Sequence, residues 1–186
     1  MKRRNVLASF VATTVSLALS GLASNAEGLN PQNTIYLDTK YGRTVIQLRP
    51  DLAPAHVERI KKLSREGFYD GVKFHRVIEG FMAQTGDPTG TGTGSSKYPD
   101  LRAEFTLTPF ERGTVGMARS QAPNSANSQF FICFSRSSFL NGKYTVFGQV
   151  VSGMEFIDKV RRGSGQSGTV SNPDVIKKMQ VAADAK

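Results

Sequence analysis

The sequence predicts a mainly β fold, a closed eight-stranded antiparallel β-barrel capped by two α-helices. Eight short runs have the alternating or continuously apolar pattern of strands, and turn residues separate them. Only two stretches show helical spacing of apolar residues. The 186 residues suit one domain, and many short strands joined by turns are typical of a closed barrel.

The first half of the chain is expected to supply four strands and one helix. Pro54 suits the first position of a helix, and Gly67 suits its end. Val57, Ile60 and Leu63 recur on one face between them, which predicts an amphipathic helix. The four strands are expected over residues 34–38, 43–48, 72–77 and 81–85.

The second half is expected to add four strands and the second helix. Residues 152–162 place Met154, Ile157 and Val160 on one helical face, and Gly163 follows them. The strands are expected over residues 113–118, 129–134, 145–151 and 175–181.

Three other features are interpreted as structural. Residues 86–97 are rich in Gly, Thr and Ser but lack the Gly-Lys-Ser/Thr of a phosphate loop, which predicts a flexible surface loop. Cys133 lies in an apolar run and is expected to be a small buried hydrophobe without a disulfide partner. His56 is expected to be solvent-facing or half-buried in the first helix.

The N-terminus has the three parts of a secretory signal. Lys2, Arg3 and Arg4 precede an apolar stretch over 6–22, and small residues at 24–26 follow it. We therefore expect a cleavable signal peptide over 1–26, a linker over 27–33 and one domain over 34–186. The alternatives are an uncleaved anchor and, because of the paired arginines, export by a twin-arginine route. The expected location is the periplasm, or the secreted fraction or a lumen if the source is not Gram-negative.

The chain is basic, but the distribution of its Lys and Arg residues argues against a nucleic-acid-binding protein. The full chain has a net charge of +9. Without Lys2, Arg3 and Arg4, 21 basic residues remain against 15 acidic ones, a net charge of +6. No Lys/Arg run is dense enough to indicate a nucleic-acid footprint. After cleavage of the signal, no stable membrane span is expected either.

Strand periodicity brings several chemically useful side chains together. Met82 and Gln84 share one strand face, and Gln129 and Phe131 share another. The run 130–134 is apolar on both faces, so it needs two apolar surroundings. One would be the barrel core, and the other is predicted to be an apolar pocket with polar anchors.

Three segments resemble the cyclophilin family of peptidyl-prolyl cis-trans isomerases. They are FHRVIEGFMAQTGD at 74–87, SQFFI at 128–132 and VFGQV at 146–150. The likeness extends over nearly all of residues 34–181, in the family's order and spacing. It implies an antiparallel eight-stranded barrel with a helix at each end and a peptide site on its outer surface.

The resemblance also implies roles for individual residues. It implies that Arg76, Gln84 and Phe131 are catalytic, whereas His75 is interpreted as structural. The residues implied to bind substrate are Phe81, Met82, Ala118, Arg119, Gln129, Phe139, Leu140 and Tyr144. The expected partners are proline-containing polypeptides, and no metal or cofactor is expected.

Such a site needs no nucleophile, because the reaction rotates an amide bond. Resonance gives this rotation a barrier of about 18–20 kcal/mol. Uncatalysed X–Pro rotation takes about 10–100 s. A fixed guanidinium near the proline nitrogen localises its lone pair and weakens the partial double bond. An apolar pocket holds the ring while the preceding carbonyl turns.

The sequence departs from many cyclophilins at three of these positions. Phe139 stands where many members carry Trp, Tyr144 where many carry His, and Arg119 where many carry Asn. Phe lacks the indole N–H donor, so weak cyclosporin binding is expected. These changes leave the residue preference around the proline open.

Two functional hypotheses remain. The first is an exported, monomeric isomerase that assists the folding of other exported proteins. The second is a chaperone or scaffold that captures proline-containing segments and turns them over only incidentally. A hydrolase that uses His75 is not supported, because no Ser or Cys lies in a nucleophile motif.

Overall fold

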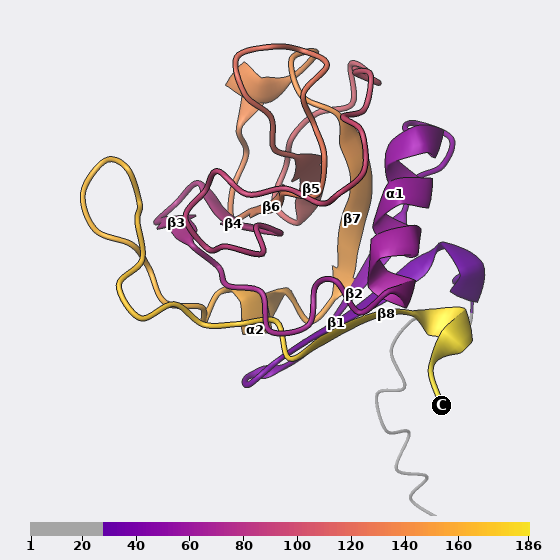
Figure 1. The fold of residues 1–186 in the computed structure, drawn as a ribbon, viewed down its shortest axis with the longest axis horizontal. Helices are drawn as coiled ribbons and strands as arrows, with labels where there is room; N and C mark the ends of the chain where they lie inside the picture. The colour runs from indigo at the N-terminus through magenta and orange to yellow at the C-terminus, as the bar shows by residue number, and fades with distance from the viewer. Residues whose placement is uncertain (1–27) are drawn as a thin grey trace, which may run out of the picture.

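Eight antiparallel strands form one curled sheet in residues 28–186, the part of the chain that the computed structural model describes (Figure 1). The predicted signal peptide and Glu27 lie outside the described residues. The strands are β1 (Thr34–Thr39), β2 (Gly42–Leu48), β3 (Arg76–Ile78), β4 (Met82–Thr85), β5 (Thr114–Met117), β6 (Phe130–Cys133), β7 (Val146–Ser152) and β8 (Lys178–Val181). The helices are α1 (Pro54–Arg65) and α2 (Met154–Ile157), and 3₁₀ turns cover Pro31–Asn33, Ser138–Leu140 and Ala182–Asp184.

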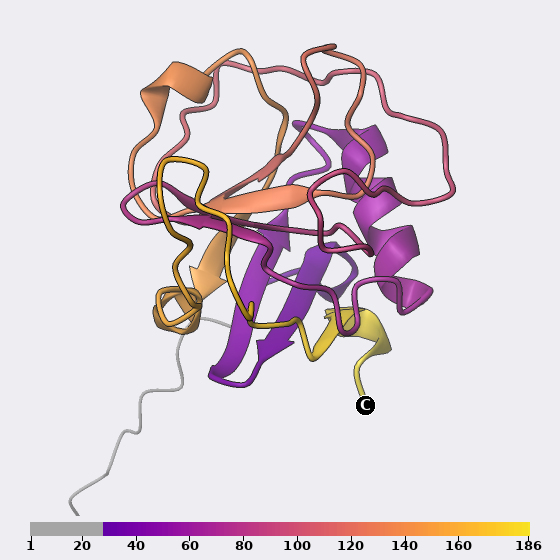
Figure 2. The ribbon, with the colours of Figure 1, turned by 60° about the vertical axis from the view of Figure 1, so that its left-hand side comes forward.

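The order of strands in the sheet is β3-β4-β6-β5-β7-β2-β1-β8. Within the described residues, the first and last strands are neighbours, with Ile35 opposite Val181 and Leu37 opposite Met179. Curling carries the β1–β2 pair across the direction of β6, as Figure 2 shows. The concave side encloses an apolar core, to which β1 contributes the alternating residues Ile35 and Leu37.

The sheet is an open, curled half-barrel, so the predicted closure of the barrel is wrong. Strands β3 and β8 lie at the two ends, and no ladder joins them within residues 28–186. Two isolated bridges, Lys73–Val175 and Arg76–Thr169, and a few single hydrogen bonds connect the region of β3 to the segment before β8. That segment contains several glycines and Pro173, which lacks an N–H donor, so it does not continue the ladder.

Helix α1 packs its predicted apolar face onto the sheet, and Val57, Ile60 and Leu63 are buried. Its N-cap residue, Ala53, has no capping side chain. Glu104 supplies the cap from a distant loop: its carboxylate accepts hydrogen bonds from the backbone N–H groups of Ala55 and His56. The helix ends at Arg65, just before Gly67, which has φ +68°.

His56 is fully buried, so the expected exposed or half-buried position is wrong. Its Nδ1 atom lies 2.6 Å from a carboxylate oxygen of Glu104, the residue that also caps the helix. Burial lowers the pKa of His56, although Glu104 opposes this shift. The partner that makes burial tolerable comes from a loop far along the sequence.

The second predicted helix is shorter than expected. The spacing over 152–162 buries Ile157 and Val160 as predicted, but α2 is a single turn. After Ile157 the chain tightens, because Val160 N–H donates to the Ile157 carbonyl three residues back. Gly163 N–H then donates to the Val77 carbonyl, which ties the chain to β3.

The sheet buries apolar residues on both sides where β4, β5 and β6 meet. All four residues of β6 are buried. Phe130 and Ile132 face the interior cluster, whereas Phe131 and Cys133 belong to a second cluster with Met82 on the opposite side. This confirms that β6 has two apolar surroundings, and the second one lies under the candidate site.

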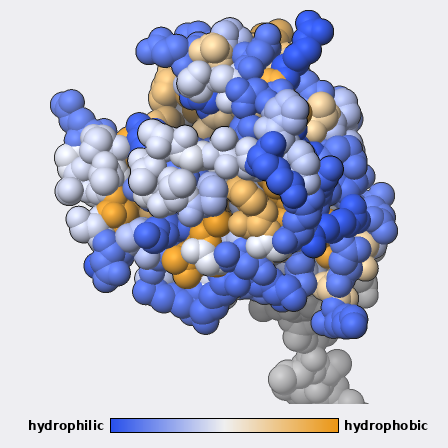
Figure 3. Space-filling view, in the orientation of Figure 1, coloured by the Kyte–Doolittle hydropathy of each residue, from blue (hydrophilic) through white to orange (hydrophobic). Residues whose placement is uncertain are grey.

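One face of the molecule is mostly polar. Figure 3 shows one face, on which hydrophilic residues dominate and the hydrophobic ones gather toward the middle. Among residues 28–186, no helix is long and apolar enough to cross a bilayer.

Candidate active site

Arg76, Gln84 and Phe131 lie in one row across three neighbouring strands. Arg76 is opposite Gln84 between β3 and β4, and Gln84 is opposite Phe131 between β4 and β6. Residues directly opposite each other in a sheet project to the same face. The adjacent residues Ala83 and Ile132 project into the interior core. The sheet register therefore sets the three predicted catalytic residues together on the outer surface.

A chain of hydrogen bonds fixes the direction of Arg76. Its Nε donates to the Ser167 carbonyl at 2.9 Å, and one terminal nitrogen donates to Gln84 Oε1 at 3.2 Å. Gln84 Nε2 donates in turn to Gln129 Oε1 at 2.9 Å. Gln129 Nε2 donates to two carbonyls of the loop over 87–94. The guanidinium is thus held before any ligand arrives, and it keeps further donors free.

Aromatic rings form one half of the site. Phe131 stacks on Phe110, with ring centroids 5.8 Å apart, and meets the ring of Tyr144 nearly at a right angle at 5.9 Å. Phe81 lies 5.3 Å from Phe139 in a tilted pair. Rings packed against one another leave little freedom to the walls of an apolar pocket.

In the apolar half of the groove, the side chains at the floor are buried and the side chain at the rim is exposed. Met82, Phe131 and Leu140 are buried. Phe139 is 61% exposed and forms the rim. A small apolar group that entered here would be surrounded by buried side chains below and covered by an exposed ring at the edge.

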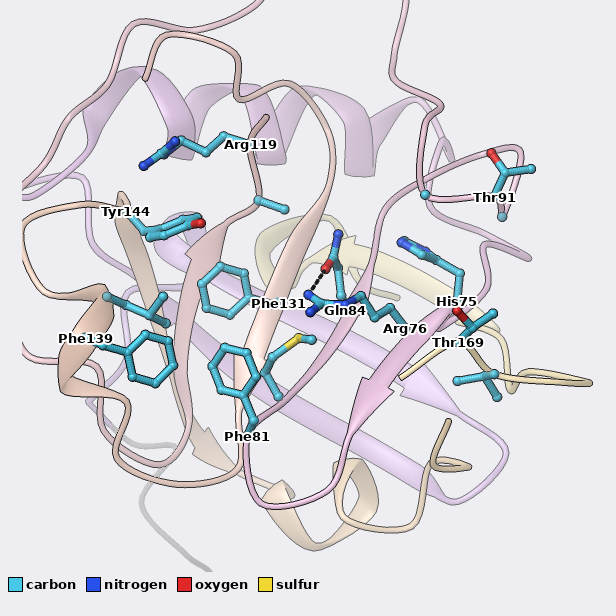
Figure 4. Close-up of a pocket in the computed structure, with 16 residues that line it drawn as sticks. His75, Arg76, Phe81, Gln84, Thr91, Arg119, Phe131, Phe139, Tyr144 and Thr169 are labelled. Atoms are coloured by element: carbon cyan, nitrogen blue, oxygen red, sulfur yellow. Dashed lines mark hydrogen bonds between the residues drawn. The ribbon is translucent and has the colours of Figure 1, made fainter. Parts of the chain in front are cut away.

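These residues surround one groove of about 510 Å³ (Figure 4). Ten of the eleven predicted site residues line it: Arg76, Phe81, Met82, Gln84, Ala118, Arg119, Phe131, Phe139, Leu140 and Tyr144. The eleventh, Gln129, lines an adjoining hollow of about 410 Å³ that shares Gln84, Ala118 and Arg119 with the groove. The individual roles of these residues remain predictions.

Arg119 has its guanidinium engaged by the protein itself. It donates to the carbonyls of Lys143, Ser120 and Gln121 at 2.9 to 3.1 Å. Its guanidinium carbon also lies 4.5 Å from the centre of the Tyr144 ring. Arg119 therefore joins two loops of the groove wall and packs against the Tyr144 ring, in addition to lining the groove.

The Thr-Gly loop over 87–94 forms a wall of the groove. The Asp87 carboxylate accepts hydrogen bonds from the N–H groups of Thr89 at 2.7 Å and Gly92 at 2.5 Å. Burial alone would raise the pKa of Asp87, but its hydrogen bonds with Thr89, Gly94 and Gly92 lower it to about 2. Asp87 thus stays ionised and organises the loop around itself.

His75 lines the groove on the side of Arg76 opposite the aromatic rings. It is 6% exposed, and neither ring nitrogen has a hydrogen-bond partner among residues 28–186. Burial lowers the pKa of His75, and the nearby Asp87 carboxylate opposes the shift. The ring is therefore a neutral polar group at the edge of the groove.

Cys133 is buried in the outer apolar cluster behind Met82 and Phe131. Burial raises the pKa of its thiol to about 12. A thiol with this pKa stays protonated at neutral pH and is a poor nucleophile. The expectation of a buried hydrophobic cysteine is confirmed.

Sequence reasoning missed one end of the groove. Six further lining residues are His75, Gly90, Thr91, Gly92, Thr169 and Val170. Asp87 followed by alternating Thr and Gly was a usable signal for an organised loop. Nothing in the sequence indicated that the segment with Thr169 crosses beside Arg76, because that bridge joins residues far apart in the chain.

The chain is similar to known proteins in both sequence and fold. Residues 34–181 match the family described as cyclophilin type peptidyl-prolyl cis-trans isomerase. A probable peptidyl-prolyl cis-trans isomerase of Brucella suis is 56% identical, over 96% of this chain and 97% of the relative. Peptidyl-prolyl cis-trans isomerase B of Bacillus subtilis is 42% identical, over 73% of this chain and 87% of that protein.

Two solved structures are similar in fold. A cyclophilin from Hirschia baltica superposes with a TM-score of 0.76 at 27% identity, over 85% of this chain and 77% of the other. A cyclophilin type isomerase of Cryptosporidium parvum, crystallised in the presence of the dipeptide Ala-Pro, has a TM-score of 0.74 at 32% identity. That match covers 80% of this chain and 98% of the Cryptosporidium chain.

Proposed function

This chain belongs to the cyclophilin-type peptidyl-prolyl cis-trans isomerase family, and we propose that it accelerates X–Pro rotation in exported polypeptides through Arg76. The family is one of enzymes, and its named members among the relatives are peptidyl-prolyl cis-trans isomerases. The observation that carries the assignment to Arg76 is its fixed guanidinium beside a buried apolar pocket.

The proposed reaction begins with the proline ring in the apolar half of the groove. Met82, Phe131 and Leu140 surround the ring, and Phe139 covers its outer edge. A ring held in this way stays still while the residue before it rotates. The rotating carbonyl passes through a twisted state in which amide resonance is lost, so binding that favours this state accelerates the reaction.

Arg76 favours the twisted state by donating toward the proline nitrogen. In the planar amide the nitrogen lone pair is delocalised, and in the twisted amide it is available as an acceptor. A donor that is already oriented by Ser167 and Gln84 interacts more strongly with the twisted state and needs no reorganisation. Gln84 and Gln129 are proposed to hold the peptide backbone on either side of the proline.

The decisive experiment measures isomerisation of a short X–Pro peptide by residues 27–186, beside Arg76→Ala. We expect clear acceleration by the wild type and a fall of at least tenfold in the variant, with peptide binding retained. Arg161→Ala, which removes an exposed arginine outside the groove, is the matched control and should keep full activity. A folded wild type that binds the peptide without accelerating rotation would favour the chaperone or scaffold hypothesis. Equal acceleration by wild type and Arg76→Ala would overturn the role of Arg76.

Export of the protein is the second part of the proposal. It is supported by the sequence of residues 1–26, which has a basic start, an apolar stretch and small residues before Glu27. We expect the mature protein to begin at Glu27 and to lie in the periplasm of a Gram-negative host. Cell fractionation with N-terminal sequencing tests this, and an uncleaved chain in the membrane fraction would indicate an anchor instead. Substitution of Arg3 and Arg4 by lysine would stop export only if the twin-arginine route is used.

We further propose that the protein is a monomer and binds cyclosporin weakly. The basis for weak binding is Phe139, which offers a ring at the rim but no N–H donor. Size-exclusion chromatography with light scattering measures the oligomeric state, and calorimetric titration measures the affinity for the drug.

A further inference from the structure

The groove continues past Arg76, away from the aromatic pocket. Figure 4 shows Phe81, Phe131, Phe139 and Tyr144 on one side of Arg76, with His75, Thr91 and Thr169 on the other. The second side is completed by Gly90, Gly92 and Val170. A proline ring needs only the aromatic side, so this polar end, defined by these six residues, has no role in the reaction described above.

The polar end contains a histidine whose ring nitrogens are left unpaired. His75 is more than nine-tenths buried, yet neither ring nitrogen has a partner in the described part of the chain. Buried polar groups without partners are rare, and each needs an explanation. The two nitrogens have almost no exposed surface, so the His75 ring forms a buried wall. The hydroxyl groups of Thr91 and Thr169 already bond to neighbouring hydroxyls, so the donors open to a ligand here are charged ones.

Two cations flank the polar end without an ion-pair partner in residues 28–186. Arg76 donates only to neutral oxygens, those of Ser167 and Gln84. The side chain of Lys73 crosses Gly90, so closely that a Cβ there would come within 2.7 Å of its Cδ atom. Among the described residues, no carboxylate lies within 4 Å of the charged group of Lys73 or Arg76.

The carboxylates of Asp87 and Asp174 are bound by other groups. Asp87 lies behind the loop, is fully buried and is saturated by hydrogen bonds from that loop. Asp174 binds Lys40 and accepts from the backbone N–H of Arg161. Asp87 is ionised and offsets one of the two cations, so Lys73, Arg76 and Asp87 together leave one positive charge at the polar end.

We propose that the polar end is a subsite for the carboxylate side chain of an acidic residue close to the isomerised proline. Lys73 supplies a charge, and Arg76 supplies a charge together with N–H donors that the protein leaves free. This inference rests on the proposed function, because it assigns the substrate class of the same groove. The enzyme would then prefer proline segments that contain Asp or Glu, which also suits the basic mature domain.

The test compares glutamate with glutamine, which has a similar size and no charge. Each of the four non-proline positions of Ala-Ala-Pro-Ala-Ala carries Glu or Gln in turn, and NMR exchange gives kcat/KM for every peptide. We expect wild-type enzyme to favour Glu about fivefold at one position, with a smaller preference in 0.5 M NaCl because salt screens exposed charges. Lys73→Met should reduce the preference to less than twofold and leave turnover of the Gln peptides unchanged.

Lys178→Met is the matched control, since it removes an exposed lysine from β8 outside the groove. It should keep the full preference for Glu. Equal rates for Glu and Gln peptides at every position, or an undiminished preference in Lys73→Met, would overturn the subsite. Failure of the wild type to accelerate any peptide, including the all-alanine one, would instead overturn the isomerase proposal and this inference with it.

Discussion

Phe131 lies directly over the backbone of Gly116. The two residues are opposite each other between β6 and β5. A Cβ at position 116 would come within 2.8 Å of Phe131 Cζ and 2.6 Å of Phe110 Cε1. The floor of the apolar pocket therefore depends on a missing side chain in the neighbouring strand.

Gly116→Ala should displace Phe131 and damage both stability and activity. Overpacking of this kind costs about 1–3 kcal/mol of unfolding free energy. We also expect kcat/KM to fall, since the ring that bounds the pocket has to move. Urea unfolding and the peptide assay measure the two effects. Gly28→Ala, where a Cβ meets nothing within 4 Å, is the control and should be neutral.

Gln84→Leu removes both the acceptor for Arg76 and the donor to Gln129. We expect kcat/KM to fall about tenfold, or roughly 1.4 kcal/mol of transition-state stabilisation, because the guanidinium loses one of its two anchors. Peptide affinity measured by titration should change less than the rate. An unchanged rate would show that the Ser167 carbonyl alone is enough to orient Arg76.

Phe139→Trp should strengthen binding of cyclosporin. The indole adds an N–H donor and apolar area at an exposed rim position, so the main chain has no reason to rearrange. We expect the dissociation constant to fall at least tenfold in a calorimetric titration, while isomerase activity stays within about threefold. An unchanged dissociation constant would mean that residues other than Phe139 limit binding.

Arg119→Ala should loosen the groove wall, because the arginine joins the carbonyls of Ser120, Gln121 and Lys143. Amide hydrogen exchange should become faster in the loop over 120–125 and around Tyr144, and kcat/KM should fall about threefold. Arg102→Ala removes an exposed arginine without these bonds and serves as the control. Unchanged exchange in both regions would contradict the bracing role.

Asp87 should make stability depend on acid pH. Its pKa falls from 3.8 to about 2 in the folded state, so its stabilisation is complete above about pH 4 and is lost as the pH falls toward 2. We expect Asp87→Asn to lower the unfolding free energy by about 1–3 kcal/mol at pH 7, with the difference from wild type shrinking below pH 4. Urea unfolding at several pH values measures this. Glu155→Gln, an exposed carboxylate, should show no such pattern.

Much of the fold could be predicted because its signals are local. The alternation of Phe130 and Phe131 reveals a strand between two apolar layers, and Pro54 with Gly67 marks the ends of α1. The outer-face grouping of Met82 with Gln84 follows from strand periodicity alone. The resemblance to a known family then brought residues from separate strands into one site.

What the sequence did not reveal depends on contacts between distant segments. The burial of His56 requires Glu104, and the open edge of the sheet depends on how the segment around Thr169 meets β3. The polar end of the groove was missed for the same reason, since it forms only where two loops approach Arg76. Periodicity within a strand carries no information on contacts between segments that are distant in the sequence.

The pairing of β1 with β8 means that the sheet can be completed only at the end of synthesis. A chain that is synthesised N-terminus first contains β1 long before β8 exists, so one edge of β1 stays without its neighbour during synthesis. Native pairing at that edge waits until residues 178–181 have emerged. A chain truncated before Lys178 would keep a bare strand edge permanently, and such edges recruit other chains into aggregates. Strand β8 therefore protects a newly made chain from aggregation at the edge of β1, and a chain that lacks it stays exposed there.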